Sequence, residues 1–441
     1  MFSDKNLRDL IYPLFIEQLL LMLVGIADTF VVSFASEADV SGVSLANSFN
    51  TILVFLFTAL SSGGAVIISQ YIGRRDNQKA EISAGQLLMI SFLISFVLSI
   101  CILIFADQIL FFLFGKVNDD VMKASKEYLV ITTYSLPALA VYDAGAAFCR
   151  SLGNAKVTMK IAWFANVINI AGNCIGVFAM HLGSAGVAWP SLISRTLSAF
   201  AITAICFSKR NIIRYKSNLI FLWDSVQLKK IMKIAVPNSI ENGIHQLVKV
   251  ALSGMVALFG TTQVAANGVA QSIWSLAAII GLAMAPAYTT VIGQCVGAGN
   301  INAANFYFKK LNKITLILSI LWNMLVFALT PLLIKYSAIS SEAKSLVIIL
   351  VLINNIFNGL AYPFAGPLGN GLRAAGDVKF TMLVSVMLTI FARLFFSALF
   401  GVWFNMGAIG IALGMSIDIV FRGAIFIRRY KSQKWTEFKL I

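Results

Sequence analysis

Charged residues are scarce in this sequence: Asp, Glu, Lys and Arg make up only 12% of its 441 residues. Apolar residues make up 59%, and the mean hydropathy is +0.85, which is well outside the balance of soluble proteins. Runs in which apolar and polar residues strictly alternate, as in the strands of an outer-membrane barrel, are missing as well. The sequence therefore predicts an all-α membrane protein.

The sequence lacks the motifs of two classes of enzyme, nucleotide hydrolases and zinc hydrolases. There is no GxxxxGK[ST] phosphate loop, and no soluble stretch is long enough for a nucleotide-binding domain. There is no HExxH motif, and the two histidines, His181 and His245, are too few for a typical zinc hydrolase. The sequence predicts neither an enzyme nor a cofactor, so any transport must use an ion gradient or run downhill.

Twelve apolar runs are long enough to cross a bilayer as helices, for which about 20 residues are needed. They lie at 10–34, 43–72, 84–106, 126–149, 159–181, 185–208, 232–258, 265–296, 312–334, 345–370, 381–403 and 405–427.

The basic residues gather in alternate loops between these runs. With a cytoplasmic N-terminus, the outside segments hold only Lys116, Lys123, Lys126, Lys335 and Lys344. This is the positive-inside pattern, so the net charge of +15 reports topology and not a nucleic-acid partner. We predict a monomeric multi-pass protein of a bacterial inner (plasma) membrane, with the lipid bilayer as its surroundings and both termini in the cytoplasm.

Short motifs recur about 224 residues apart. SQYIGRRDNQKA at 69–80 returns as GQCVGAGNINAA at 293–304, and RSLGNAKVTM at 150–159 returns as RAAGDVKFTM at 373–382. The single-residue matches are Pro13 with Pro237, Glu17 with Glu241, Gly183 with Gly407 and Gly186 with Gly410. Matches in the same order at nearly one offset predict two like halves. Each half has an even number of spans, so the repeat is parallel, as in transporters with a site between two halves.

The repeat divides the chain into four parts. We expect an N-terminal lobe at 1–208, a cytoplasmic linker at 209–231, a C-terminal lobe at 232–427 and a basic cytoplasmic tail at 428–441. The linker is basic and amphipathic, which suits a helix on the inner membrane surface.

The residues GIADTFVV at 25–32, together with the paired loop motifs, resemble the multidrug and toxic compound extrusion (MATE) family over nearly the whole chain. The resemblance implies twelve helices in two pseudo-symmetric six-helix lobes around a V-shaped cleft. It implies a secondary antiporter that exchanges H⁺ or Na⁺ for amphipathic, drug-like and often cationic compounds. The lobes would rock between inward-open and outward-open states.

Ionisable and polar groups inside the spans are the candidates for mechanism, because they are costly there. Asp28 in the first span could exchange a proton or Na⁺ for an organic cation, or could serve packing alone. Asn166, Asn169 and Asn173 share one face of the fifth span, and their amide oxygens suit Na⁺ beside Asp28. In the resembling family the first-span carboxylate is an ion site, and Ser191 corresponds to a hydroxyl there. That family has an acid at the position of Asn173, so its two-carboxylate site is incomplete here.

The seventh span carries Glu241, His245 and Lys249 along one helical face. They could relay protons or contact substrate, since histidine titrates near neutrality, or they could form a self-neutralising ladder. The acids that some relatives carry in this lobe fall here at His245 and near Tyr362, so a second cation site is doubtful.

Four more charges lie within spans. Asp418 and Arg422, one helical turn apart, are expected to pair. Arg195 and Arg393 could meet Asp418 across helices or line a cleft for an anionic substrate.

Two alternatives to the antiporter remain. A lipid-linked saccharide flippase has a similar fold, and Lys249, Arg195 and Arg393 would suit its pyrophosphate. An anion channel lined by the same cations is the other. The paired loop motifs favour the MATE antiporter.

Overall fold

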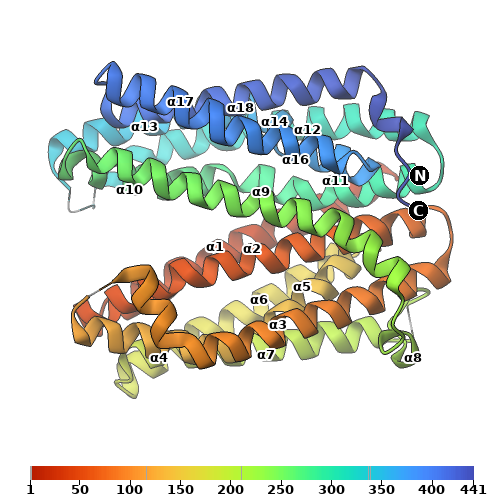
Figure 1. The fold of residues 1–441 in the computed structure, drawn as a ribbon, viewed down its shortest axis with the longest axis horizontal. Coiled ribbons are helices and arrows are strands. Elements are labelled where there is room, and N and C mark those ends of the chain that lie inside the picture. Colours follow the sequence, from red (N-terminus) through yellow and green to blue (C-terminus); the bar gives the residue numbers. More distant parts are fainter. Residues whose placement is uncertain (1, 116, 210, 336, 338) are drawn as a thin grey trace. The chain divides into compact units, whose positions relative to one another are not determined.

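The computed structural model describes residues 2–115, 117–209, 211–335, 337 and 339–441 (Figure 1). Lys116, one of the lysines predicted to face outside, is not among them. Every regular element in the described ranges is a helix, so the predicted all-α class is confirmed. The chain forms two compact units, Phe2–Val236 and Pro237–Ile441. The boundary falls inside helix α9 (Ser225–Ala257), so the segment predicted as a linker belongs to the first unit.

The first three helices of the first unit begin with side-chain caps. Ser3, Ser36 and Asp76 each accept a hydrogen bond from a backbone N–H of the first turn of the next helix, which otherwise lacks a partner. The elements are α1 (Asp4–Val32), α2 (Glu37–Gly73), α3 (Asn77–Phe114), α4 (Asp119–Tyr134), α5 (Leu136–Ser151), α6 (Ala155–Cys174), the π-helical turn η1 (Ile175–Ala179), α7 (Gly183–Phe207) and α8 (Ser217–Ile220). α6 packs along both α1 and α7, which places the polar residues of these three helices together.

The second unit repeats this order with more interruptions. Its elements after α9 are α10 (Thr261–Ala277), α11 (Ile279–Gly297), α12 (Ile301–Lys335), α13 (Ser341–Leu360), α14 (Tyr362–Ala365), α15 (Pro367–Ala375), α16 (Val378–Met387), η2 (Leu388–Arg393), α17 (Leu394–Ser397), η3 (Ala398–Trp403), α18 (Gly407–Lys431) and η4 (Lys434–Glu437). The π-helical turn η3 matches η1 at the repeat offset, whereas the π-helical turn η2 has no counterpart among the described residues of the first unit. Such turns often mark functional positions.

Ten helical segments of the described residues are long and apolar enough to cross a membrane. The predicted spans 126–149 and 232–258 are not among the ten. The first is divided between α4 and α5 at Ser135. The second belongs to α9, whose N-terminal part is polar. Several helices also extend beyond the predicted limits, because capped polar turns continue the helix past the apolar run. The expected 84–106 is in fact Asn77–Phe114.

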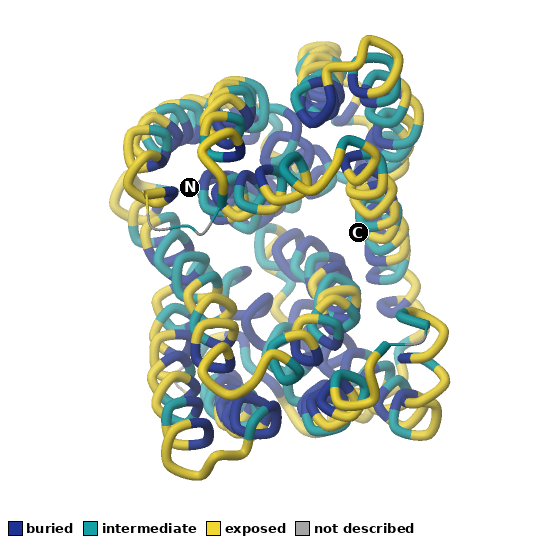
Figure 2. The backbone as a smooth tube through the Cα atoms, turned by 90° about the vertical axis from the view of Figure 1, so that its left-hand side faces the viewer, coloured by how far each residue is buried: buried dark blue, intermediate teal, exposed yellow. Residues whose placement is uncertain are grey.

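The outward faces of the helices are apolar. Phe112, Phe200, Leu247 and Leu258 are all exposed, while Asn, Ser and Thr side chains lie buried between helices. Figure 2 shows exposed and buried residues alternating along most helices. Polar groups inside and apolar groups outside are the arrangement expected in lipid.

The linker does not form the surface helix that its amphipathic sequence predicts. Before residue 225 its described residues contain only the four-residue α8, and its last seven residues form the start of α9. The chain is tied to α3 by the buried Glu81, which pairs with Lys216 at 2.6 Å. The fully buried Tyr215 ring stacks on Phe148 with centroids 5.1 Å apart. Burial raises the pKa of the Tyr215 phenol well above its ordinary value. Partners inside the unit thus hold the linker, which sequence periodicity does not report.

The C-terminal residues also fold back onto their own unit. Trp435 in η4 is fully buried and packs against Phe308, with ring centroids 5.2 Å apart. Arg429 pairs with the buried Asp377 at 2.6 Å. The segment predicted as a basic tail is therefore part of the packed structure of the second unit.

Candidate functional site

Four predicted site residues of the first unit form one hydrogen-bonded chain. Asn173 Nδ2 donates to Asp28 Oδ1 at 2.6 Å and to Asn169 Oδ1 at 3.2 Å. Asn169 Nδ2 in turn donates to Ser191 Oγ at 3.0 Å. All four residues are buried. A carboxylate from α1 is thereby linked to two amides of α6 and a hydroxyl of α7.

Close approach of α6 and α7 makes this chain possible. A Cβ atom at Gly172 would lie 2.7 Å from Pro190, and one at Gly176 would lie 2.3 Å from the Gly186 carbonyl oxygen. No residue larger than glycine fits such contacts without a shift of the helices. The small residues therefore bring Ser191 within hydrogen-bond distance of Asn169.

One acceptor beside Asp28 is left without a partner. Asn173 Oδ1 is buried and has no hydrogen bond from any residue that the structure describes, with the amide orientation taken from the network. A buried unpaired acceptor costs free energy, which a proton donor or a cation would relieve. Asn166 is different, because its Nδ2 donates only to Ala162 O of its own helix at 2.8 Å. Asn166 shares the predicted helical face but not the chain of contacts.

Na⁺ could be held here only by mixed oxygen ligands. Within the described part of the chain no group of three or more His, Cys, Asp or Glu residues could hold a metal ion. The available donors are one carboxylate together with amide and hydroxyl oxygens, which are the hard ligands such a cation prefers. The same donors could equally serve a proton on Asp28.

The first unit also has a carboxylate, next to Arg195, that was not predicted from the sequence. Asp143 lies in α5, and its Oδ2 is buried without a hydrogen bond among the described residues, as is Tyr142 Oη. Arg195 interacts electrostatically with both Asp28 and Asp143. Arg195 also donates to Ser135 Oγ at 2.9 Å, so its structural partners lie in its own unit. The position of Asp143 well inside the apolar run 126–149, away from the polar end at Glu127, was the signal that could have identified it.

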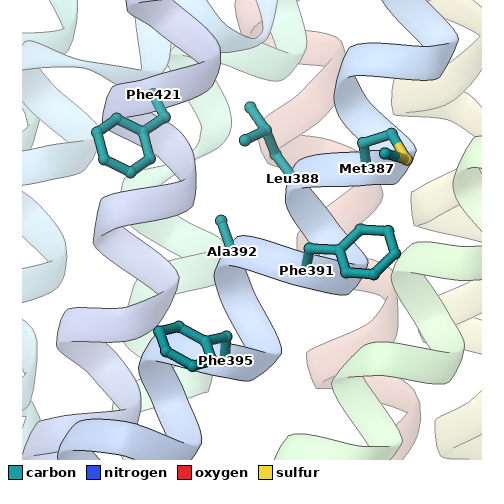
Figure 3. Close-up of a pocket in the computed structure, with 6 residues that line it drawn as sticks. All are labelled: Met387, Leu388, Phe391, Ala392, Phe395 and Phe421. Carbon is teal, nitrogen blue, oxygen red and sulfur yellow. The ribbon is translucent and has the colours of Figure 1, made fainter.

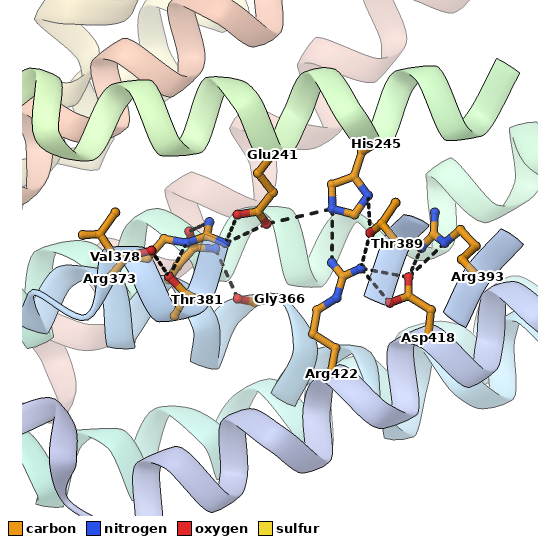
Figure 4. Close-up of polar contacts among 11 residues, drawn as sticks. Glu241, His245, Gly366, Arg373, Val378, Thr381, Thr389, Arg393, Asp418 and Arg422 are labelled. Atoms are coloured by element: carbon orange, nitrogen blue, oxygen red, sulfur yellow. Dashed lines mark hydrogen bonds and ion pairs between the residues drawn. The ribbon is translucent and has the colours of Figure 1, made fainter. Parts of the chain in front are cut away.

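The second unit contains a larger charged network, drawn in Figure 4. Glu241 accepts from Arg373 Nη2 with both oxygens, at 2.7 and 2.6 Å. His245 Nε2 lies 3.9 Å from Glu241 Oε1, and His245 Nδ1 lies 3.2 Å from Thr389 Oγ1. The structure thus joins two members of the predicted row on α9. Lys249, the third, is exposed and lies outside this network.

Asp418 stands between two arginines. Arg422 Nη2 donates to both of its oxygens at 2.8 Å, so these residues pair as predicted. Arg393 donates to Asp418 Oδ2 from Nε at 2.9 Å, and its Nη2 lies 2.7 Å from the same oxygen. Arg422 also reaches Thr389 Oγ1 at 2.8 Å and His245 Nε2 at 3.2 Å. Both cationic side chains are therefore engaged within the unit.

The repeated motifs make the same Glu–Arg ion pair in each unit, with a threonine bonded to the glutamate in the first and to the arginine in the second. In the first, Glu17 pairs with Arg150 at 3.0 Å and accepts from Thr158 Oγ1 at 2.6 Å. In the second, Arg373 pairs with Glu241 and donates from Nε to Thr381 Oγ1 at 3.3 Å. Glu241 thus occupies the place of Glu17. We call these two groups the Glu–Arg–Thr contacts.

Three asparagines in the second unit form hydrogen bonds that were not predicted from the sequence. Asn358 Nδ2 donates to Asn323 Oδ1 at 3.1 Å, and Asn355 Nδ2 donates to Asn323 O at 3.2 Å. These bonds join α12 to α13. Two asparagines three residues apart on a helical face were the signal that could have suggested them.

An apolar pocket of about 560 Å³ lies between the α16–α17 segment and α18 (Figure 3). Its lining is Met387, Leu388, Phe391, Ala392, Phe395 and Phe421. None of these side chains offers a charge or a hydrogen bond, so the pocket suits an apolar group and no ion chemistry.

Long apolar helices, buried carboxylates and amides, and two units with one repeated contact define a multi-pass membrane transport protein. The sequence model described as MatE matches residues 13–175 and again residues 237–399, two segments that are 224 residues apart. The chain belongs to this family of multidrug and toxic compound extrusion transporters, which confirms the family that the motifs predicted.

Individual relatives agree with the family. The chain is 27% identical to the uncharacterized transporter YisQ of Bacillus subtilis (strain 168), over 99% of this chain and 96% of that protein. It is 22% identical to the probable multidrug resistance protein NorM of Thermotoga maritima, over 98% and 93%. A solved outward-facing multidrug resistance MATE transporter is 20% identical, with a TM-score of 0.91 over 98% and 96%. These likenesses confirm the fold.

Proposed function

We propose that this protein is a secondary active efflux antiporter that exchanges H⁺ or Na⁺ for amphipathic, mostly cationic drug-like compounds. The observation that carries the proposal is the buried Asp28 carboxylate bonded to Asn173, beside an amide oxygen without a partner. The names of relatives such as the probable multidrug resistance protein NorM support the substrate class.

Asp28 is the coupling group in this proposal. A buried carboxylate must be neutralised by a proton or a cation, because an isolated charge is costly in a medium of low dielectric constant. When the coupling ion leaves, the negative charge and the amides of Asn169 and Asn173 attract an organic cation instead. Ser191 holds Asn169 in place for both states. Exchange follows because the two cations compete for one charge.

The rest of the proposal concerns the setting. The protein acts as a monomer in a bacterial inner membrane, with both termini cytoplasmic, and its units rock to expose the site to each side in turn. The network around Glu241 and His245 contacts substrate or relays protons in this scheme, whereas Lys249 lies outside the network and would act only as a separate substrate contact. The flippase is not proposed, because relatives are named as probable multidrug resistance proteins, which favours drug-like substrates.

Proteoliposomes test the proposal directly. Purified protein is reconstituted, a fluorescent cationic dye is loaded, and a Na⁺ gradient or a pH gradient is imposed separately. Dye movement against its own gradient under one of the two conditions is the expected result, and that condition identifies the ion. Dye movement that ignores both gradients would exclude antiport.

A further inference from the structure

The charged network of the second unit carries one positive charge too many. Its cationic residues are Arg373, Arg393 and Arg422, and its anionic residues are Glu241 and Asp418. Glu241 is matched by Arg373, so the single carboxylate of Asp418 must serve two guanidinium groups. The side chain of Asp418 is 0% exposed, and those of Arg393 and Arg422 are 13% and 10% exposed. An unbalanced charge at such a depth is expensive unless something neutralises it.

His245 cannot provide the balance. Arg422 Nη1 lies 3.2 Å from His245 Nε2, and a guanidinium can only donate, so Nε2 must accept. The ring then carries its proton on Nδ1, facing Thr389 Oγ1 at 3.2 Å. The imidazole is neutral in this arrangement, and the surplus charge remains on the arginines.

Arg422 also has one N–H donor without an acceptor among the described residues. The residue is 8% exposed, and its Nε–H has no acceptor among the residues that the structure describes, although its Nη1 and Nη2 are both engaged. A buried N–H of a charged group without an acceptor is costly. The surplus charge and the unpaired donor thus occur on the same side chain, and both call for an anion.

The repeat shows that the scaffold does not need these charges. At the offset of 224, Arg393 answers to Asn169, Asp418 to Ser194 and Arg422 to Ser198, all of them uncharged. In the first unit Asn169 donates to Ser191 between α6 and α7, while Ser194 and Ser198 bond only within α7. The charges of the second unit are therefore an addition to the shared architecture.

We propose that the second unit holds a binding site for a small monovalent anion in contact with Arg422. The ligand chemistry is a single negative charge that accepts from the Nε–H, and it has two sources: free chloride or the carboxylate group of an amphipathic organic compound. The site lies apart from Asp28 and does not depend on the coupling role proposed for that residue.

Thermal unfolding of the purified full-length protein in detergent tests the site. The midpoint is measured in sodium HEPES at constant ionic strength while chloride or benzoate replaces the buffer anion, because a ligand that binds only the folded state raises the midpoint in a saturable way. Saturation with chloride alone identifies a halide site, and saturation with benzoate at lower concentration identifies a carboxylate site. Absence of a saturable rise with both anions would overturn the proposal.

Three variants should change the affinity for the anion in opposite directions, which a purely structural role would not produce. Arg422→Gln removes the donor and Arg393→Gln removes the surplus charge, so each should weaken anion binding by about tenfold or more, equivalent to about 1.4 kcal/mol. Asp418→Asn raises the surplus and should strengthen binding by a similar factor. If Asp418→Asn weakens anion binding as the arginine variants do, the site is wrong.

Arg429→Gln is the matched control. It removes a part-buried arginine from the same helix, but that arginine pairs with Asp377 and not with the network. Arg429→Gln should lower the unfolding midpoint. The anion concentration that gives half of the maximal rise in the midpoint should stay at the wild-type value. An equal loss of anion binding in Arg429→Gln and Arg422→Gln would also count against the site.

Discussion

Asp28 and Asn173 are 145 residues apart in the sequence, yet Asn173 Nδ2 lies 2.6 Å from Asp28 Oδ1. The contact joins α1 to α6 near the C-terminal ends of both helices. The Asn173 amide therefore stabilises the charged form of the Asp28 carboxyl group. Two of the predictions below depend on this bond.

Neutralising Asp28 should abolish coupled transport. Asp28→Asn keeps the shape and removes the charge, so dye exchange in proteoliposomes should fall by at least about tenfold, a typical size for the loss of a coupling interaction. Thr29→Val is the control, because Thr29 is exposed and its hydroxyl bonds only to Gly25 O of the same helix at 3.0 Å. Wild-type exchange by Asp28→Asn would remove this residue from the mechanism.

Asn173 and Asn166 offer a matched pair on one helix. Asn173→Leu removes the donor to Asp28 together with the unpaired Oδ1, so the concentration of coupling ion at half-maximal exchange should rise about tenfold. Asn166→Leu removes an amide that bonds only within α6, and this concentration should stay nearly unchanged. Equal effects of the two substitutions would mean that general polarity of the α6 face matters, and not the bond to Asp28.

The Glu–Arg–Thr contacts should stabilise both units to a similar degree. Glu17→Gln removes the carboxylate that pairs with Arg150, and Glu241→Gln removes the carboxylate that pairs with Arg373. Breaking one partner of a buried ion pair costs about 3–5 kcal/mol. Thermal unfolding in detergent should show a clear loss for each single variant. The double variants Glu17→Gln/Arg150→Gln and Glu241→Gln/Arg373→Gln should recover part of it, and no recovery would show that the charge pairing is not the source.

The C-terminal segment should be needed for stability. Trp435→Ala empties a fully buried site against Phe308 and Tyr430, and loss of a buried aromatic ring costs about 3–5 kcal/mol. Trp403→Ala is the control, since Trp403 is exposed, and it should change the unfolding midpoint only slightly. A negligible effect of Trp435→Ala would indicate that the segment is not docked in solution.

Local sequence patterns predicted the parts of the candidate site that lie on one helix. Asn169 and Asn173 are one turn apart, so periodicity alone places them together, and the same holds for Asp418 and Arg422. The motif around Asp28 pointed to α1 because its residues match a family, and the role of Asp28 stays a prediction. Helical class and the repeat followed from composition and from matching motifs, which are properties of the linear chain.

Contacts between helices could not be predicted in this way. The sequence offered Asp418 as a partner for both Arg393 and Arg195 without deciding between them, and only Arg393 is bonded to it. Nothing in the sequence states that Arg195 would donate to Ser135 instead, or that Trp435 would be buried in the second unit. Each depends on which helices are neighbours and on how closely glycines such as Gly172 let them approach. Asp143 was passed over because a single acid within an apolar run carries no pattern of its own.

The Glu–Arg–Thr contacts fix one point on the first helix of each unit, and Asp28 lies about 16 Å beyond that point on α1, at 1.5 Å per residue. The middle of α1 is bonded to α5 and α6 through Glu17, while its C-terminal part is bonded to α6 through Asp28. If a cation replaced the Asn173 bond, as the proposed function requires, only the segment after Glu17 would be released. This segment could then bend while the middle of the helix keeps its contacts.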